Sequence, residues 1–175
     1  MPEKRKNFRQ AIIGAAIIAV TGAIVLVSFF AGTREVSAIN EAVELYFVDS
    51  ELMMLIPSTF YLPDVSREKA AKKVVSELIN GRDSNDKIMR IMPKIKGGIT
   101  VKVKNDTAYV DLSNEFVQAH TDNPHKEILT VYSIVDSLTS IDGIKKVRFT
   151  IAGKEQAKFK GNIDMREVFF PDYTV

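Results

Sequence analysis

The sequence predicts an α+β domain, a two-layer α/β sandwich with two helices on one face of a mixed sheet, preceded by one transmembrane helix. Three observations lead to this prediction. An uncharged apolar run covers residues 11–31. Residues 66–80 and 124–140 repeat apolar side chains at helical spacing, and the segments around them alternate apolar with polar residues, as half-buried strands do. Amphipathic helices and half-polar strands bury their apolar faces against one another, which gives two layers.

The composition excludes several classes of protein. A chain of 175 residues has room for one domain after an N-terminal segment. Its formal net charge is +2, and much of that excess lies in residues 1–10, so the remainder has no basic surplus for binding nucleic acid. Cysteine is absent, which excludes disulfides, thiolate metal sites, a cysteine nucleophile and a lipid-modified anchor.

Residues 1–10 form a basic tail, and residues 11–31 are long enough to cross about 30 Å of hydrocarbon as a helix. The positive-inside rule places the tail in the cytoplasm and the C-terminal domain outside, in a single-pass protein of the cell membrane. A cleaved signal peptide is the alternative, with a candidate cleavage site at residues 36–38, although its apolar core normally spans about 7 to 15 residues. Small residues at four-residue spacing in this run would allow a homo-oligomer: Ala15, Ala19 and Ala23.

The outer domain is expected to span residues 42–175, after a polar linker at 32–41. Strands are predicted where apolar and polar residues alternate, in the segments 42–48, 52–62, 99–103, 108–112, 146–151 and 157–170. Pro57 cannot donate to a sheet ladder, so its segment is an edge strand or a hairpin arm. Asn105 and Asp106 form the turn of a hairpin between the third and fourth strands.

Two helices are predicted from their caps and their periodicity. Ser66 is a typical N-cap for the first helix, and Gly81 is a typical stop just after its end. Pro124 suits the first turn of the second helix, which is expected to end near Ser140. Ser113 is expected to cap a further short helix after the hairpin.

No catalytic, cofactor-binding or metal-binding site emerges, and the protein is not expected to be an enzyme. The string His120, Asp122 and His125 lacks a recognised zinc or iron spacing and is interpreted as a solvated loop. Asp111 and Glu115 are interpreted as turn and first-turn residues, and not as an acid/base pair. Three residues that could bind calcium lack the glycine and the glutamate of an EF-hand and are interpreted as a solvated turn: Asp83, Asn85 and Asp86. Four lysines around the hairpin are interpreted as a strand face exposed to solvent: Lys94, Lys96, Lys102 and Lys104. The alternative is a basic stripe that binds an anionic polymer or lipid.

Apolar surface is the better functional clue. Residues 52–56 are consecutive apolar side chains, which a single strand cannot all direct inward. The C-terminal residues 168–173 pose the same question. Either a loop buries these residues in the core, or they form a docking surface for an unidentified protein partner. The predicted partner surface consists of Leu52, Met53, Met54, Phe169 and Phe170.

Several segments resemble the GerMN domain of sporulation and spore-germination proteins. They are VELYFVD at 43–49, KKVVSELINGR at 72–82, ITVKVKNDTAYVDLSNEF at 99–116, EILTVYSIVDSLTSIDGIKKVRFTIAG at 127–153 and GNID at 161–164, with Pro93 before the hairpin. The most specific part is the AYVDLSNEF hairpin, followed by the second helix and a strand ending in Ala-Gly. None of these motifs is catalytic.

The resemblance implies a mixed α/β fold like that of ring-building modules in secretion systems, acting outside the membrane as a scaffold in sporulation or germination. The chain departs in two ways from the name-giving proteins of the family, which resemble lipoproteins with two tandem domain copies. This chain has one domain copy and no lipid-accepting cysteine, and Gly81-Arg82 replaces the family's Gly-Pro after the first helix. The alternative function is an extracytoplasmic sensor of a cell-wall or lipid component, which predicts a concave pocket lined by aromatic residues.

Overall fold

The computed structural model describes residues 41–81, 87–156 and 158–175, which belong to one compact unit, Ile39–Val175. The predicted basic tail at 1–10, the predicted transmembrane helix at 11–31 and nearly all of the linker at 32–41 lie outside the described residues. Within the described ranges, no helix is both long and apolar enough to cross a membrane.

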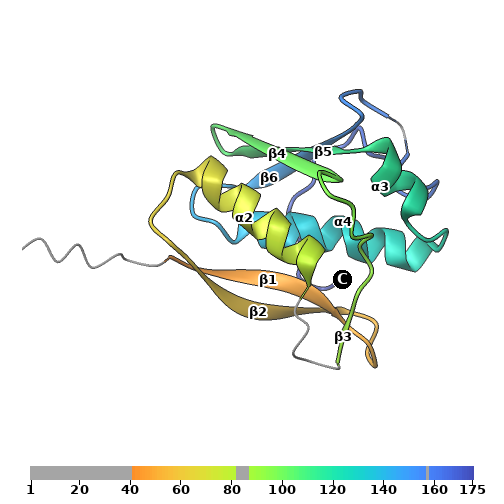
Figure 1. Ribbon diagram of the computed structural model, residues 1–175, viewed down its shortest axis with the longest axis horizontal. Coiled ribbons are helices and arrows are strands. Elements are labelled where there is room, and N and C mark those ends of the chain that lie inside the picture. The colour runs from red at the N-terminus through yellow and green to blue at the C-terminus, as the bar shows by residue number, and fades with distance from the viewer. Residues whose placement is uncertain (1–40, 82–86, 157) are drawn as a thin grey trace, which may run out of the picture. The chain divides into compact units, whose positions relative to one another are not determined.

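The strands form two separate three-stranded sheets (Figure 1). In the first sheet, β1 (Glu41–Asp49) is central and pairs antiparallel with β2 (Leu55–Leu62) and β3 (Ile88–Met89). β3 pairs with only the last two residues of β1, so most of that side of β1 has no strand partner. β2 is an edge strand, as the proline at position 57 predicts, because its outer side needs no ladder donor.

The second sheet is mixed, in the order β4-β5-β6. β4 (Ile99–Lys104) and β5 (Thr107–Leu112) form the predicted antiparallel hairpin, and β5 runs parallel to β6 (Lys146–Ile151). The hairpin turn contains Asn105 in the left-handed region, at a φ of 56°. Asparagine tolerates that conformation better than most residues, which explains its place in the turn.

The predicted strand over residues 157–170 is wrong. The described part of this segment makes only isolated bridges, such as the one between Phe169 and Val147. Gly161 has a φ of 136°, and the Asp164 carboxylate accepts a hydrogen bond from the Arg166 N–H at 3.0 Å. These two local turns divide a segment whose composition otherwise suits a strand.

Three helices complete the described fold: α2 (Arg67–Asn80), α3 (Asn114–Ala119) and α4 (Pro124–Thr139). Ser113 caps α3 as predicted, because its side chain accepts the Phe116 N–H at 3.1 Å. Ser66 occupies the N-cap position of α2 without a side-chain hydrogen bond. Gly81 ends α2 at a φ of 70°, which glycine adopts at no steric cost.

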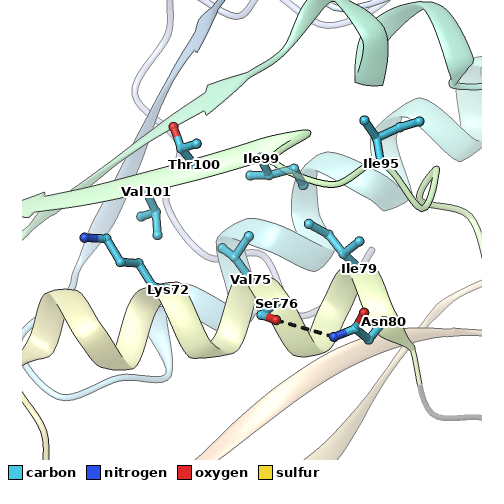
Figure 2. Close-up of a pocket in the computed structure, with 10 residues that line it drawn as sticks. Lys72, Val75, Ser76, Ile79, Asn80, Ile95, Ile99, Thr100 and Val101 are labelled. Atoms are coloured by element: carbon cyan, nitrogen blue, oxygen red, sulfur yellow. Dashed lines mark hydrogen bonds between the residues drawn. The ribbon is translucent and has the colours of Figure 1, made fainter.

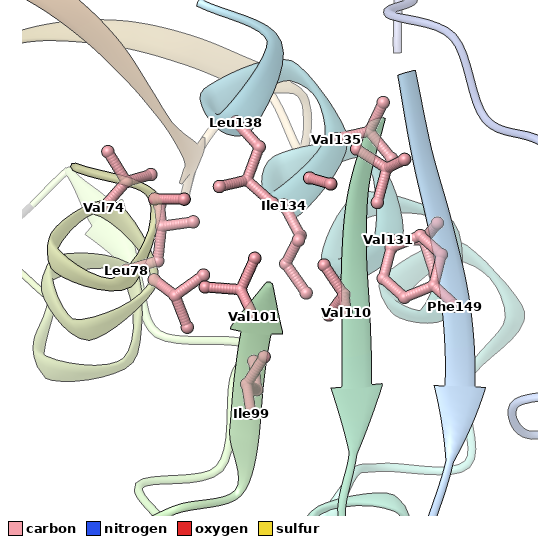
Figure 3. Packing of buried hydrophobic residues seen from close by; sticks show 14 of the residues in the cluster. Val74, Leu78, Ile99, Val101, Val110, Val131, Ile134, Val135, Leu138 and Phe149 are labelled. Atoms are coloured by element: carbon pink, nitrogen blue, oxygen red, sulfur yellow. The ribbon is translucent and has the colours of Figure 1, made fainter. Parts of the chain in front are cut away.

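α2 and α4 lie between the two sheets (Figure 1). A mixed α+β fold is confirmed, and both helices cover the same face of β4-β5-β6. The single two-layer sandwich is wrong, because the β1 sheet covers the helices from the opposite side. In the core between α2, α4 and the β4 sheet, apolar side chains of the helices meet Val101 and Val110 (Figure 3). The labelled helical members of this core are Val74, Leu78, Val131, Ile134, Val135 and Leu138.

The unpaired side of β1 is closed by hydroxyl groups of α4. Ser133 Oγ donates to the Tyr46 carbonyl at 2.6 Å, and Ser137 Oγ accepts the Tyr46 N–H at 2.8 Å. Ser140 Oγ accepts the Glu44 N–H at 3.1 Å and lies 3.0 Å from the Glu44 carbonyl. Serines at spacings of four and three residues share one helix face, so α4 satisfies this strand edge in place of another strand.

Candidate functional site

A loop at residues 49–54 presents apolar side chains to solvent on a fixed backbone. The carboxylate of buried Asp49 accepts the N–H groups of Glu51 and Leu52, both at 2.8 Å, and these bonds lower its pKa. The Asp49 N–H donates to the Met54 carbonyl at 2.9 Å, and the Met53 N–H donates to the Asp49 carbonyl at 2.9 Å. Leu52 is 65% exposed and Met54 is 40% exposed. The loop therefore exposes apolar surface without relying on flexibility.

Two distant segments brace this loop. His125, at the start of α4, lies with Nε2 2.9 Å from the Met53 carbonyl. At the C-terminus, the Val175 carbonyl accepts the Leu55 N–H at 3.1 Å, and the Tyr173 ring stacks on Tyr46 with centroids 5.5 Å apart. The loop and the C-terminal tail thus form one region, although more than a hundred residues separate them in the sequence.

The five residues of the predicted partner surface do not share one environment. Leu52, Met54 and Phe170 are exposed, Phe170 by 60%, whereas Met53 is half-buried and packs against the small apolar cluster of Val48, Leu55 and Leu129. We call the three exposed side chains the apolar surface set. Whether a partner binds them stays a prediction.

Phe169 is buried, unlike the three residues of the apolar surface set. It is only 7% exposed, and its ring makes edge contacts with Phe149 and Tyr132 at centroid distances of 5.2 and 6.2 Å. Its backbone also exchanges two hydrogen bonds with Val147, at 2.8 and 2.9 Å. The prediction that Phe169 belongs to a surface is therefore wrong. Of two consecutive phenylalanines in extended backbone, one points inward, and Phe169 is that one.

An open groove of about 550 Å³ borders this C-terminal segment. Tyr132 and Phe170 contribute aromatic side chains to its lining, buried Phe169 borders it, and Glu167 and Asp172 contribute carboxylates. Such an aromatic concavity is the feature that the alternative prediction of a ligand sensor requires.

The histidine string is divided between core and surface. His125 is exposed, as expected, although it lies in the first turn of α4 and not in a loop. His120 is buried, so the solvated-loop prediction is wrong for it. His120 Nε2 lies 2.8 Å from the Thr130 hydroxyl, and its ring packs against Phe159 with centroids 4.9 Å apart. Burial lowers the pKa of His120 and favours the neutral ring. No group of three metal-binding side chains occurs among the described residues.

The carboxylates of the hairpin motif serve the fold. Asp111 Oδ1 accepts the Thr150 hydroxyl at 2.5 Å and the Gly153 N–H at 2.7 Å, which joins β5 to the end of β6. Glu115 lies in the first turn of α3, as predicted. The AYVDLSNEF motif therefore joins β5, β6 and α3.

Glu127 was missed by the sequence analysis. This fully buried carboxylate accepts the backbone N–H groups of Lys160, Asn162 and Ile163 at 3.1 to 3.3 Å and the Asn162 side-chain amide at 2.7 Å. Burial raises its pKa, but these hydrogen bonds lower it, and the net direction is downward. Glu127 thus anchors the GNID segment to α4, a role for which its position four residues into a helix gave no signal.

Two groups of candidate residues remain, the lysines near the hairpin and the residues considered for calcium binding. Lys94, Lys96, Lys102 and Lys104 are all exposed, as expected for a solvated strand face and its approach. Asp83, Asn85 and Asp86 lie outside the described residues.

The comparisons with known proteins agree on one family. The model of the Germane family, described as "Sporulation and spore germination", matches residues 44–157. No curated protein matches the chain significantly.

Three solved structures share the fold. The first GerMN domain of the sporulation protein GerM from Bacillus subtilis is 23% identical, with a TM-score of 0.59, over 77% of this chain and 99% of that domain. The tandem GerMN domains of the same protein are 24% identical, with a TM-score of 0.60, over 75% of this chain and 46% of that one. A candidate lipoprotein from Clostridium perfringens is 21% identical, with a TM-score of 0.54, over 75% of this chain and 87% of that one.

The family match covers more than half of the chain and runs from within β1 to just beyond β6. The chain therefore belongs to the Germane family, which is linked to sporulation and spore germination, and carries one GerMN-like domain.

Proposed function

We propose that this protein is a membrane-anchored interaction or scaffold module, acting outside the cytoplasmic membrane in sporulation or germination. The observation that carries the proposal is the contrast within the domain. The motif carboxylates Asp111 and Glu127 form hydrogen bonds that hold the fold together. The apolar surface set is exposed, and two of its members lie on a loop that hydrogen bonds hold in place. Rigid apolar surface of this kind is typical of protein interaction sites.

The membrane anchor rests on residues 11–31 and the basic residues before them. The structural relative described as a candidate lipoprotein adds support, because a domain of the same fold would there be held at a membrane by lipid. In intact cells that make the protein, external protease should digest the C-terminal domain and leave a short membrane-bound N-terminal fragment. Full-length protein in a soluble fraction would contradict the anchor.

The partner surface is tested by charge substitution. Leu52→Asp with Met54→Asp should leave the free energy of unfolding within about 0.5 kcal/mol, because both side chains are exposed. Photo-crosslinks formed from the neighbouring exposed position 51 in sporulating cells should disappear in the double variant, and spore yield or germination should fall. Tyr61→Asp is the matched control, since Tyr61 is as exposed as Leu52 but lies on β2. Unfolding of the double variant, or a phenotype equal to that of the control, would sink the proposal.

A ligand sensor is the second candidate, favoured by the aromatic groove at Tyr132 and Phe170. It predicts that a muropeptide or a phospholipid headgroup raises the melting temperature of the chain and that Phe170→Ala removes the effect. Absence of any shift at millimolar muropeptide or headgroup would leave the interaction module as the better explanation. Turnover of either compound, lost on changing one titratable side chain, would contradict both.

A further inference from the structure

β4 is the outer strand of its sheet, and its open side still carries free hydrogen-bonding groups. The Glu68 carboxylate accepts the Val103 N–H, so Val103 directs its backbone away from β5. In an antiparallel ladder the direction alternates, so Val101 and Ile99 also face the open side. The Ser113 N–H donates to the Gly98 carbonyl, so Gly98 faces β5, as the alternation requires for the residue before Ile99. Among the described residues, the Val101 backbone has no hydrogen-bond partner.

A groove of about 300 Å³ runs between this strand and α2 (Figure 2). Its floor and walls are mainly apolar, and its rim on α2 is polar. The lining side chains that matter here are Val75, Ser76, Ile79, Ile95, Ile99 and Val101. The α2 stretch from Lys72 to Asn80 that borders it covers about 12 Å at 1.5 Å per residue. This length matches about four residues of extended chain.

The charges around the groove are unbalanced. Lys94 and Lys96 flank the lining residue Ile95, and both side chains are exposed. The nearest carboxylates on α2 are already engaged, because Glu68 pairs with Lys72 at 2.6 Å and Glu77 pairs with Lys73 at 2.7 Å. An occupant with carboxylates would therefore meet uncompensated positive charge, whereas a basic occupant would be repelled.

We propose that this groove binds an extended, acidic and apolar segment of a partner protein, which adds to β4 as a further strand. The partner's backbone would pair with Val101, its apolar side chains would enter the groove, and its carboxylates would lie near Lys94 and Lys96. Strand addition between a sheet edge and a helix is an established mode of peptide recognition. A second copy fits poorly, because the open edge strand β2 contains Pro57 and no acidic residue. This surface is separate from the apolar surface set and does not depend on it.

The probe is an acetylated eight-residue peptide in which valine alternates with glutamate, added to the full-length chain in detergent micelles. Amide hydrogen exchange followed by NMR should show Val101 exchanging rapidly in the free chain and slowly with peptide. Lys102, whose N–H faces β5, should be protected in both states. A peptide with lysine in place of glutamate should not protect Val101.

Two pairs of variants sharpen the test. Ser76→Trp should fill the groove and abolish binding, whereas Lys69→Trp, on an exposed part of α2 outside the groove, should not. Lys94→Glu with Lys96→Glu should weaken binding about tenfold, because two favourable charge contacts become repulsive. Lys154→Glu with Lys158→Glu, exposed and remote from the groove lining, should have little effect.

Three results would overturn the proposal. The acidic peptide fails to protect Val101 at millimolar concentration. Val101 is already protected in the free chain, which means that another segment of the same chain fills the groove. Sedimentation shows self-association that Ser76→Trp removes, which makes a second copy the occupant. Loss of crosslinks from position 51 would leave the peptide result unchanged, so the two surfaces can fail separately.

Discussion

β1 and β4 each have one side without a full strand partner, and the molecule treats these two sides differently. At β1, serine hydroxyls of α4 take the place of a strand and satisfy the backbone of Glu44 and Tyr46. At β4, the Glu68 carboxylate satisfies the Val103 N–H group, and the Val101 backbone has no partner among residues 41–81, 87–156 and 158–175. One edge is closed inside the fold and the other is left open beside a groove.

The domain protects one edge within its own fold, and on our proposal it keeps the other for recognition. An open strand edge is a template for pairing with another chain, which is a hazard unless it is covered or made selective. The β1 edge is covered by a helix that cannot move without exposing the core. The β4 edge is flanked by lysines, which discourage most strands and favour acidic ones.

The largest effect is expected from breaking the closed edge. Ser133→Ala with Ser137→Ala leaves the Tyr46 N–H and carbonyl without partners inside the interface between β1 and α4. Each unsatisfied buried group costs about 1 to 3 kcal/mol, so the free energy of unfolding should fall by about 2 to 6 kcal/mol for the two groups. Urea denaturation measures this loss.

Thr139→Ala is the matched control for the serine pair. The Thr139 hydroxyl bonds to the Val135 carbonyl within α4 itself, so its removal should change stability by no more than about 0.5 kcal/mol. If the double serine variant were as stable as this control, water or a rearranged backbone would be satisfying Tyr46, and the closed edge would not depend on α4.

A smaller effect, of opposite sign, is expected at Asp136 on the same helix. Asp136 Oδ1 accepts the Asp172 N–H at 3.0 Å, but Oδ2 is buried without a partner. Burial, with a contribution from the charge of Asp172, raises the Asp136 pKa to about 6 from 3.8. At neutral pH its charge therefore destabilises the fold, unlike the satisfied serines beside it.

Asp136→Asn keeps the acceptor and removes the charge, so it should stabilise the fold by about 1 to 3 kcal/mol at pH 7.5. Because the folded pKa is raised, the wild type loses stability relative to the variant as pH rises from about 4 to 6. The difference should vanish below pH 4 and stay constant above about pH 6.5. Urea midpoints of both proteins across this range would show it, and a difference independent of pH would contradict it.

Much of the fold was predictable because its signals are local. The hairpin followed from strict alternation around Asn105-Asp106, and both long helices followed from their periodicity and caps. The exposed side chains Leu52 and Met54 followed from a run too apolar for one strand. These arguments need only residues close together in the sequence.

What the sequence did not reveal depends on distant partners. The split into two sheets was not predicted because an amphipathic helix is expected to bury one face, whereas α4 contacts a sheet on each side. The role of Ser133 and Ser137 depends on β1, which is distant in the sequence. Glu127 looked like an ordinary first-turn carboxylate until the GNID segment reached it. The burial of Phe169 depends on its pairing with Val147, which no local pattern predicts.

The smallest effect is expected at the open edge, where Glu68→Ala removes the side-chain partner that the described residues provide for the β4 backbone. The Val103 amide should then exchange as fast as that of Val101, because both face the open side without an acceptor. Lys72→Met is the control, since it removes the ion pair at 2.6 Å but leaves the Glu68 carboxylate on Val103. Global stability should change far less than in the serine variant, because the Glu68 side chain is solvated and a surface ion pair contributes little. Unchanged Val103 exchange in Glu68→Ala would mean that the β4 edge is protected by something else, and the contrast between the two edges would be lost.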